Sequence, residues 1–350
     1  MKKLFLVIVT FICIFPLTVK ADSAKSSIVM DVNSGRVLYA NNINEERLIA
    51  SITKIMTCII AIEEGNLDKE ITTGEEILKM YGTSIYLELN EKMRLEDLLY
   101  GLMLRSGNDA AVVIANYIAG SEEEFVKLMN EKAKDLGMDH TIFNNAHGLD
   151  DETENYSTAY DMAILTKYAL KNKEFRKIFG TNKYEVQTTN KSYLWYNRVK
   201  LISSDDTCIG GKNGYTPKAG KTLVTAFKNN DLEIVIVSLK DSDEYNNHQE
   251  LSKEIFSNYS MYEIVDKDDF DLVIDEKKYY VKESFSYPLT EKEKDQVKVL
   301  ASIDEEIKKG KVGNIEITLE EETLAKIPIY IKEEKKKTGG ILEFFKNLFS

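Results

Sequence analysis

The chain has 350 residues, which exceeds the usual size of a single domain, so two domains are expected. Hydrophobic residues make up 43% and charged residues 30% of the chain, an ordinary composition for a globular protein. The net charge of −12 argues against a nucleic-acid partner, because binding to phosphates relies on clustered Lys and Arg side chains.

The N-terminus has the composition of a secretory signal peptide. Lys2 and Lys3 precede an apolar stretch over residues 4–17, and a cleavage site with small residues ends at Ala21. The pattern predicts that the protein is exported and that residues 1–21 are removed as a signal peptide. An uncleaved membrane anchor is the alternative, but the apolar stretch is short for a bilayer span.

Cysteine and histidine are too scarce to predict a metal site. The mature chain keeps only Cys58 and Cys208, which lie too far apart to indicate a disulfide framework. No Cys/His cluster has the spacing of a zinc site, so we expect no metal and no cofactor. His140, His147 and His248 occur in no recognisable catalytic setting and are interpreted as structural or surface residues.

The first predicted elements are a β-hairpin and a buried helix. Strands over residues 27–31 and 35–39 flank the turn Asn33-Ser34-Gly35. The next segment begins Ser51-Ile52-Thr53-Lys54 and continues as an apolar run over residues 55–62, which predicts a helix buried on nearly every side.

Ser51 and Lys54 are candidates for nucleophilic catalysis. Residues three apart lie on one face of a helix, so the Lys54 amine can reach the Ser51 hydroxyl. A serine hydroxyl is a poor nucleophile until a base takes its proton. A lysine can be that base when burial lowers its pKa.

A second polar motif interrupts a helical region over residues 95–119. The interruption reads Arg105-Ser106-Gly107-Asn108-Asp109, which predicts a tight turn between two helices that projects Ser106 and Asn108. An ordinary loop with a helix cap is the alternative. An extended segment or short strand is expected over residues 84–90.

The following segments predict an α+β fold. Helices are expected over residues 122–136 and 158–170, and the chain then becomes rich in strands from residue 186. A strand containing Lys212-Asn213-Gly214 precedes an antiparallel hairpin, and a helix over residues 248–262 closes this part. Helices between two groups of strands indicate helices packed on an antiparallel sheet, in a domain over residues 22–265.

The remainder of the chain divides into two parts. Short alternating runs separated by glycines and charged turns predict a small all-β domain over residues 266–332. Residues 333–350 are predicted to be a basic linker and an amphipathic helix, which is too short to span a bilayer but suits its interface. A frayed tail or a helix docked on the protein are the alternatives.

Three motifs therefore follow one another in order: Ser51-x-x-Lys54, Ser106-Gly107-Asn108 and Lys212-Asn213-Gly214. Ser-x-x-Lys, Ser-Asp-Asn and Lys-Thr-Gly mark penicillin-binding proteins and class A β-lactamases. The chain resembles the low-molecular-mass penicillin-binding proteins, the serine-type D-alanyl-D-alanine carboxypeptidases of peptidase family S11. The resemblance extends from the signal peptide to the C-terminal tail and includes the family's small β domain and amphipathic membrane anchor.

The resemblance implies a β-lactamase/transpeptidase-like domain and an enzyme of cell-wall biosynthesis at the outer face of the cytoplasmic membrane. Its substrates would be peptidoglycan pentapeptide stems, from which it removes the terminal D-alanine, and β-lactam antibiotics would be covalent inhibitors. By the same resemblance, Ser51 would attack the terminal peptide bond, Lys54 would take its proton and Ser106 would relay a proton to the departing D-alanine.

The family pattern also implies the substrate-binding residues. Asn108 would hold the substrate's amide, and Lys212 would supply positive potential for its terminal carboxylate. Asn213, Gly214 and Tyr215 would lie along the extended peptide, with the backbone N–H groups of Ser51 and Tyr215 as the oxyanion hole.

Two departures from the family pattern leave alternatives open. Asn213 replaces the usual threonine, which predicts altered affinity for substrate or β-lactam, and Ile49 replaces a proline. The Asn213 departure keeps open a non-catalytic, penicillin-binding wall-binding protein. A class A-like β-lactamase is the other alternative, but its glutamate motif should follow Ser-Gly-Asn, whereas Glu88-Leu89-Asn90 precedes it.

Overall fold

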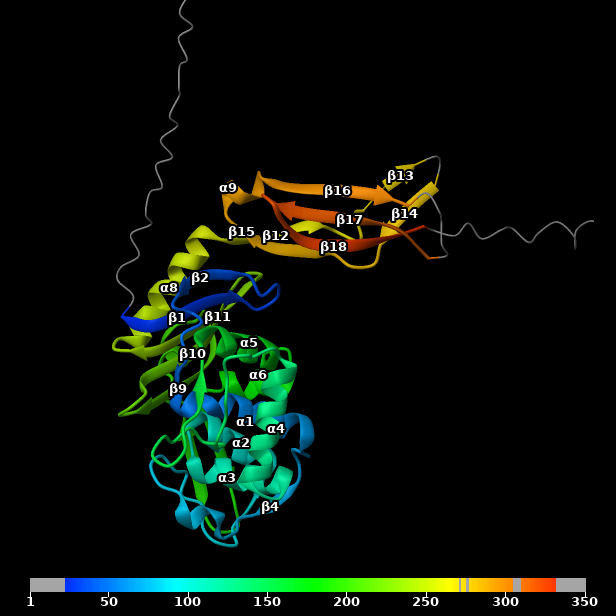
Figure 1. Ribbon diagram of the computed structural model, residues 1–350. Coiled ribbons are helices and arrows are strands. Elements are labelled where there is room, and N and C mark those ends of the chain that lie inside the picture. The colour runs from blue at the N-terminus through cyan, green and yellow to red at the C-terminus, as the bar shows by residue number, and fades with distance from the viewer. Residues whose placement is uncertain (1–22, 271, 275–276, 305–309, 332–350) are drawn as a thin grey trace, which may run out of the picture.

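The structure is a computed structural model that describes residues 23–270, 272–274, 277–304 and 310–331. It has a larger part of helices around a sheet and a smaller, elongated part built of strands (Figure 1). The predicted signal peptide and the predicted C-terminal helix lie outside the described residues. No helix in the described part of the chain is both long and apolar enough to cross a membrane.

A five-stranded antiparallel sheet forms the centre of the larger part, in the order β2-β1-β11-β10-β9. The predicted N-terminal hairpin and the predicted hairpin after the third motif are both confirmed within it. Its strands are β1 (Ala24–Asp31), β2 (Val37–Asn41), β9 (Cys208–Thr216), β10 (Gly220–Asn229) and β11 (Leu232–Asp241).

Both faces of this sheet are covered, which explains the continuous apolar runs of its central strands. Alternate residues of β11 point to opposite faces, so Val235 and Val237 join one core while Ile234 and Ile236 join another. Helix α8 covers the second face, and the other long helices lie on the first (Figure 1). The predicted α+β fold, with helices packed on an antiparallel sheet, is therefore correct.

Helix α1 lies at the centre of the helical layer. Every residue from Lys54 to Ala61 is buried, as the apolar sequence predicts. The helices are η1 (Ala50–Thr53), α1 (Lys54–Glu64), η2 (Glu75–Lys79), α2 (Leu95–Leu104), α3 (Asn108–Ala119), α4 (Glu122–Asp135), α5 (Ala159–Ala169), α6 (Lys173–Gly180), α7 (Leu201–Ser204) and α8 (Glu244–Asn258).

Two of the longer helices differ from the sequence prediction. Helix α6 was not predicted, although Asn172 caps its N-terminus and its apolar residues have helical spacing. The closing helix spans 244–258 rather than 248–262, because the residues after it pair as a strand with a distant segment. Such long-range pairing overrides local helix propensity.

Three two-stranded sheets complete the larger part. In the hairpin of β7 and β8, Tyr193 and Trp195 are buried and alternate with solvent-facing residues. The strands of these small sheets are β3 (Arg47–Leu48) with β6 (Tyr156–Ser157), β4 (Glu70–Thr72) with β5 (Lys92–Arg94), and β7 (Lys183–Gln187) with β8 (Ser192–Tyr196).

The smaller part is a second antiparallel sheet with its own apolar core, in the order β13-β14-β18-β17-β16. Strand β12, which the sequence analysis assigned to the first domain, pairs with β15, and its Val265 belongs to this second core. The elements are β12 (Ser260–Val265), β13 (Leu272–Ile274), β14 (Lys277–Val281), β15 (Phe285–Leu289), α9 (Glu291–Lys294), β16 (Val297–Ile303), β17 (Lys311–Leu319) and β18 (Glu322–Ile331).

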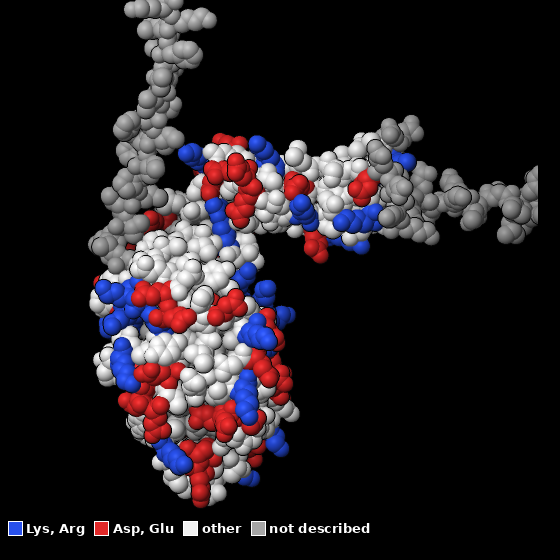
Figure 2. Space-filling view, viewed as in Figure 1, with Lys and Arg blue, Asp and Glu red and all other residues white. Residues whose placement is uncertain are grey.

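The surface charge is mixed. On the face shown in Figure 2, acidic and basic side chains alternate over both parts of the molecule. This mixture of charges accompanies a net charge of −12 for the whole chain.

Candidate active site

Ser51 lies in the 3₁₀ turn η1 immediately before helix α1. Its neighbours Ala50 and Ile52 are buried, whereas Ser51 is partly exposed. Ala50 has a φ of +49°, a left-handed conformation that costs a residue with a side chain roughly 1 kcal/mol or more. The chain therefore holds Ser51 in a tight and strained turn that presents its hydroxyl at the start of α1.

The amine of Lys54 has three hydrogen-bond contacts. It lies 3.1 Å from the Ser51 Oγ, 2.7 Å from the Asn108 Oδ1 and 2.5 Å from the His147 carbonyl oxygen. The predicted contact between Ser51 and Lys54 is thus present, and the structure joins the first motif to the second.

Burial changes the acidity of this lysine. Lys54 is 0% exposed, and desolvation lowers its pKa to about 7, with Asp109 acting against this shift and Arg198 adding to it. A large fraction of the Lys54 amine is therefore unprotonated at neutral pH, as a general base requires.

Ser106 and Lys212 form a second contact pair. Ser106 lies in the turn between α2 and α3 with a φ of +64°, and the Lys212 amine donates to its Oγ at 3.0 Å. Lys212 is 1% exposed, and burial, with the nearby cations Lys54 and Arg198, lowers the pKa of its amine well below the usual value. The lysine of the third motif therefore contacts the serine of the second.

Both ends of the Asn108 side chain are held within the protein. Its Oδ1 accepts from Lys54, and its Nδ2 donates to the Tyr81 carbonyl oxygen at 2.7 Å. Next to it, the Asp109 carboxylate accepts from the backbone N–H groups of Ile85 and Leu87. These bonds fix the predicted extended segment, which forms no strand, against the N-terminus of α3.

Strand β9 brings the third motif against the nucleophile. A Cβ at Gly214 would lie 2.7 Å from the Ser51 backbone nitrogen, so only glycine permits this approach. β9 is the last strand of its sheet, and Tyr215 has a 65% exposed side chain. Asn213 lies near Tyr245, whose hydroxyl donates to the Arg198 carbonyl oxygen at 3.1 Å.

Sequence reasoning missed two contributors to the site. The His147 carbonyl oxygen binds Lys54, whereas His147 was interpreted as a structural or surface residue. Arg198 lies close enough to lower the pKa of both lysines, and its guanidinium donates to the Thr83 hydroxyl at 3.3 Å. A backbone acceptor and a lone arginine have no motif from which they could be found.

Comparison with known proteins identifies the family. A family model described as D-alanyl-D-alanine carboxypeptidase matches residues 16–243, which is more than half of the chain. The chain belongs to the D-alanyl-D-alanine carboxypeptidase family. It is 34% identical over 343 residues to D-alanyl-D-alanine carboxypeptidase DacF of Bacillus subtilis, covering 92% of this chain and 88% of that protein.

Other D-alanyl-D-alanine carboxypeptidases agree with this assignment. DacC of Escherichia coli is 35% identical over 236 residues, covering 63% of this chain and 58% of that protein. Penicillin-binding protein 6B of Escherichia coli superposes with a TM-score of 0.73 at 25% identity, over 90% of this chain and 97% of that one.

The fold extends to more distant relatives. Penicillin-binding protein 5 of Haemophilus influenzae has a TM-score of 0.76 at 23% identity, over 91% of this chain and 99% of that one. The protein is a serine-type D-Ala-D-Ala carboxypeptidase of the low-molecular-mass penicillin-binding proteins and acts on peptidoglycan. Glu88, the residue behind the β-lactamase alternative, instead bonds Lys191 and Asn190 on the surface.

Proposed function

We propose that this carboxypeptidase removes the terminal D-alanine of pentapeptide stems through an acyl-enzyme on Ser51. The observation that carries the proposal is the 3.1 Å contact between the Ser51 Oγ and the buried Lys54 amine. The unprotonated amine accepts the hydroxyl proton while the Ser51 oxygen attacks the carbonyl carbon of the terminal peptide bond.

The attack places negative charge on the carbonyl oxygen. The backbone N–H groups of Ser51 and Tyr215 are the proposed donors to this oxygen, and donors arranged in advance are often the largest catalytic contribution. The close approach of β9 at Gly214 to the Ser51 nitrogen supports this pairing, because it brings the two backbone segments side by side.

The C–N bond then breaks, and the departing D-alanine nitrogen needs a proton. Ser106 is the proposed relay: its hydroxyl gives its proton to this nitrogen and takes up in exchange the proton that Lys54 accepted from Ser51, while Lys212, 3.0 Å away, holds the hydroxyl in place. Lys54 is then unprotonated again, and the site has neither gained nor lost a proton. Water subsequently attacks the ester on Ser51 and releases the shortened stem.

The substrate's terminal carboxylate requires donors and positive charge. Asn213 is the proposed hydrogen-bond donor at the edge of β9, while Lys212 and Arg198 provide the positive potential. The lowered pKa of Lys212 makes Arg198 the more dependable cation, because a guanidinium keeps its proton throughout the physiological range. Asn108 would contact the substrate's amide after exchanging one of its present partners.

The location of the protein is also a proposal. The pattern of residues 1–21 supports export, and the amphipathic pattern of residues 333–350 supports contact with the membrane surface. Together they support the proposed location at the outer face of the cytoplasmic membrane, where the enzyme reaches peptidoglycan.

A labelling experiment tests the chemistry. A fluorescent penicillin should label the wild-type enzyme covalently and should fail to label Ser51→Ala, while Ser203→Ala, at an exposed serine, is the control. The wild type should also release D-alanine from a pentapeptide ending in D-Ala-D-Ala. Labelling of Ser51→Ala would refute the proposed nucleophile, and labelling without D-alanine release would favour the non-catalytic binder.

A further inference from the structure

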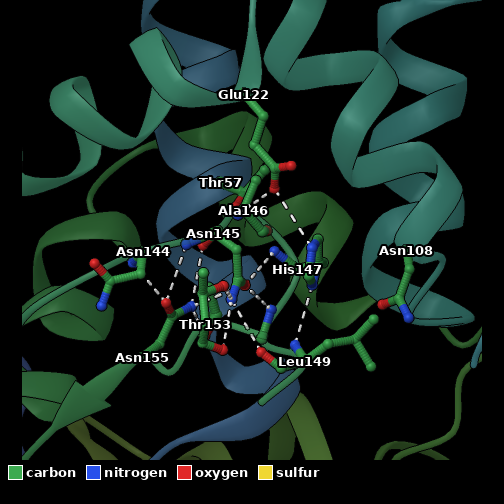
Figure 3. A network of polar contacts seen from close by, with 12 residues as sticks. Thr57, Asn108, Glu122, Asn144, Asn145, Ala146, His147, Leu149, Thr153 and Asn155 are labelled. Carbon is green, nitrogen blue, oxygen red and sulfur yellow. Dashed lines mark hydrogen bonds and ion pairs between the residues drawn. The ribbon is translucent and has the colours of Figure 1, made fainter. Parts of the chain in front are cut away.

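The loop that supplies the His147 carbonyl oxygen is held by an extensive polar network (Figure 3). Within the loop, the Asn145 Oδ1 accepts from the backbone nitrogens of His147 and Gly148, at 3.2 and 2.6 Å. Its Nδ2 donates to the Leu149 carbonyl oxygen at 2.9 Å. These bonds make the loop stiff but do not fix its position relative to the helices.

Two side chains from different helices hold the loop at Ala146. Thr57 on α1 donates to the Ala146 carbonyl oxygen at 2.6 Å, and Glu122 on α4 accepts from the Ala146 nitrogen at 2.9 Å. The peptide groups on both sides of Ala146 are thus each bonded to a helix side chain, one residue before the carbonyl that binds Lys54.

Glu122 also faces the imidazole of His147. The same Oε1 atom lies 3.5 Å from the His147 Nε2. The His147 Nδ1 accepts from the Leu149 backbone nitrogen at 3.0 Å, so a neutral ring carries its proton on Nε2, toward Glu122. Burial and the charge of Lys54 lower the pKa of His147 to about 3, which keeps the ring neutral.

The orientation of the Lys54 amine depends on this carbonyl. A neutral amine has two N–H bonds and one lone pair. The His147 carbonyl oxygen and the Asn108 Oδ1 can accept the two N–H bonds, which leaves the lone pair for the Ser51 hydroxyl. If either acceptor moves, the amine can rotate and the lone pair is no longer directed at Ser51.

We propose that Glu122 is a positioning residue for acylation, which holds the Ala146–His147 segment so that the His147 carbonyl oxygen orients the Lys54 amine. Its action is geometric, because Asp109 and Arg198, rather than Glu122, are the charges that shift the pKa of Lys54. The inference rests on the proposed roles of Ser51 and Lys54. Nothing in the three sequence motifs indicates it.

Three substitutions separate position from charge. Glu122→Ala removes the oxygen that accepts from the Ala146 nitrogen. Glu122→Asp keeps the negative charge, but its shorter side chain moves the oxygen away from Ala146. Glu122→Gln keeps an oxygen at the same place without the charge. The side chain already borders a cavity of about 620 Å³, so truncation enlarges an existing space instead of creating a void in the core. Glu123→Ala, an exposed neighbour at the same cavity, is the matched control.

The measurement is the rate of Ser51 acylation by a fluorescent penicillin, together with KM and kcat for D-alanine release from a pentapeptide. Glu122→Ala and Glu122→Asp should lower the acylation rate and kcat by about 10- to 100-fold, the scale of a misplacement near 1 Å, with little change in KM. Glu122→Gln should retain most of the rate, and Glu123→Ala should match the wild type.

The outcomes are distinguishable. Unchanged acylation in Glu122→Ala, or a fast Glu122→Asp beside a slow Glu122→Gln, would overturn the positioning role. If Glu122→Ala does not fold, as judged by its melting temperature, the comparison of the Asp and Gln variants decides. Failure of the wild type itself to be labelled at Ser51 would instead refute the proposed function.

Discussion

At the scale of single residues, the proposed chemistry depends on how Lys54 is surrounded. Removal of the amine from water lowers its pKa, while the nearby Asp109 carboxylate limits that shift. The resulting pKa of about 7 lies where a base is both largely unprotonated and still able to accept a proton at neutral pH. The same amine in water would be protonated and inactive.

This pKa predicts the pH dependence of acylation. The rate of acylation by a penicillin should rise with pH and level off above about 7, because only the unprotonated Lys54 amine accepts the Ser51 proton. Below that pH the rate should fall about tenfold per pH unit, since each unit reduces the unprotonated fraction tenfold. The melting temperature over the same range is the control for unfolding. A profile that is flat from pH 5 to 9 would contradict the role of Lys54.

Asn213 is the residue in which this chain departs from the family motif. Its position on the edge strand, beside Tyr245, predicts that it binds the substrate's terminal carboxylate. Asn213→Ala should raise KM for a pentapeptide about 10- to 100-fold, the value of a hydrogen bond to a charged group. Asn213→Thr should retain binding. Tyr245→Phe, which removes the hydroxyl near Asn213 together with its bond to the Arg198 carbonyl oxygen, is the control. An unchanged KM in Asn213→Ala would exclude this role.

At the scale of elements, the site is the meeting point of the turn before α1, the turn between α2 and α3, strand β9 and the loop that contains His147. Gly148 brings the backbone of this loop close to the backbone at Ala50 and Ser51. It has a φ of +89°, and a Cβ there would lie 2.0 Å from the Ala50 carbonyl oxygen and 3.0 Å from the Ser51 nitrogen. No other residue type fits without moving the backbone at Ser51.

Gly148→Ala should therefore impair both folding and acylation. The left-handed φ and the backbone overlap together should cost about 3 kcal/mol or more, measured as the free energy of unfolding in urea. The folded fraction of this variant should be acylated slowly, because the added Cβ can avoid the backbone at Ala50 only if Ser51 is displaced. Gly137→Ala is matched in φ, at +72°, but has no atom within 4 Å of the added Cβ. That control should lose only about 1 kcal/mol and acylate normally.

The elements also show what sequence patterns can and cannot predict. The strands of the main sheet and the buried helix α1 were predictable because their apolar patterns are long and regular. The break between α2 and α3 was predictable from a glycine among small polar residues. Strand β12 was not, because it depends on pairing with β15, a segment distant in sequence.

The candidate site likewise has some features that sequence patterns predict and others that they do not. The three motifs identify six side chains, and the Lys54–Ser51, Lys54–Asn108 and Lys212–Ser106 contacts join five of them in two groups. The His147 contribution was not predictable, since any residue type can offer a carbonyl oxygen. The direct contact of Lys212 with Ser106 also depends on packing between β9 and the helices, which spacing along the chain does not encode.

At the scale of the whole molecule, one arginine joins the two parts. Arg36, in the turn between β1 and β2, lies over the rings of Tyr259 and Tyr287, at 5.5 and 5.3 Å. Its guanidinium donates to the Pro288 carbonyl oxygen at 2.5 Å and forms an ion pair with Glu293. Tyr259 directly follows α8, so the contact lies where the chain enters the second sheet, as the arrangement in Figure 1 shows.

This arginine should set the angle between the two parts without affecting catalysis. β2 lies at the opposite edge of the main sheet from β9, so Arg36 is remote from the site. Arg36→Ala removes contacts worth on the order of 2–3 kcal/mol, which should broaden the distribution of overall shapes in small-angle X-ray scattering. Cleavage by added protease near Tyr259 should also become faster.

Acylation of a soluble penicillin should stay at the wild-type rate in this variant. Arg36→Lys should give an intermediate result, because an ammonium keeps the charge but not the paired hydrogen bonds of a guanidinium. Arg94→Ala is the control, since Arg94 forms its ion pairs with Asp97 and Glu96 inside the larger part. If scattering and proteolysis are the same for Arg36→Ala and the wild type, the β12–β15 pairing and the chain connection suffice to hold the second sheet in place.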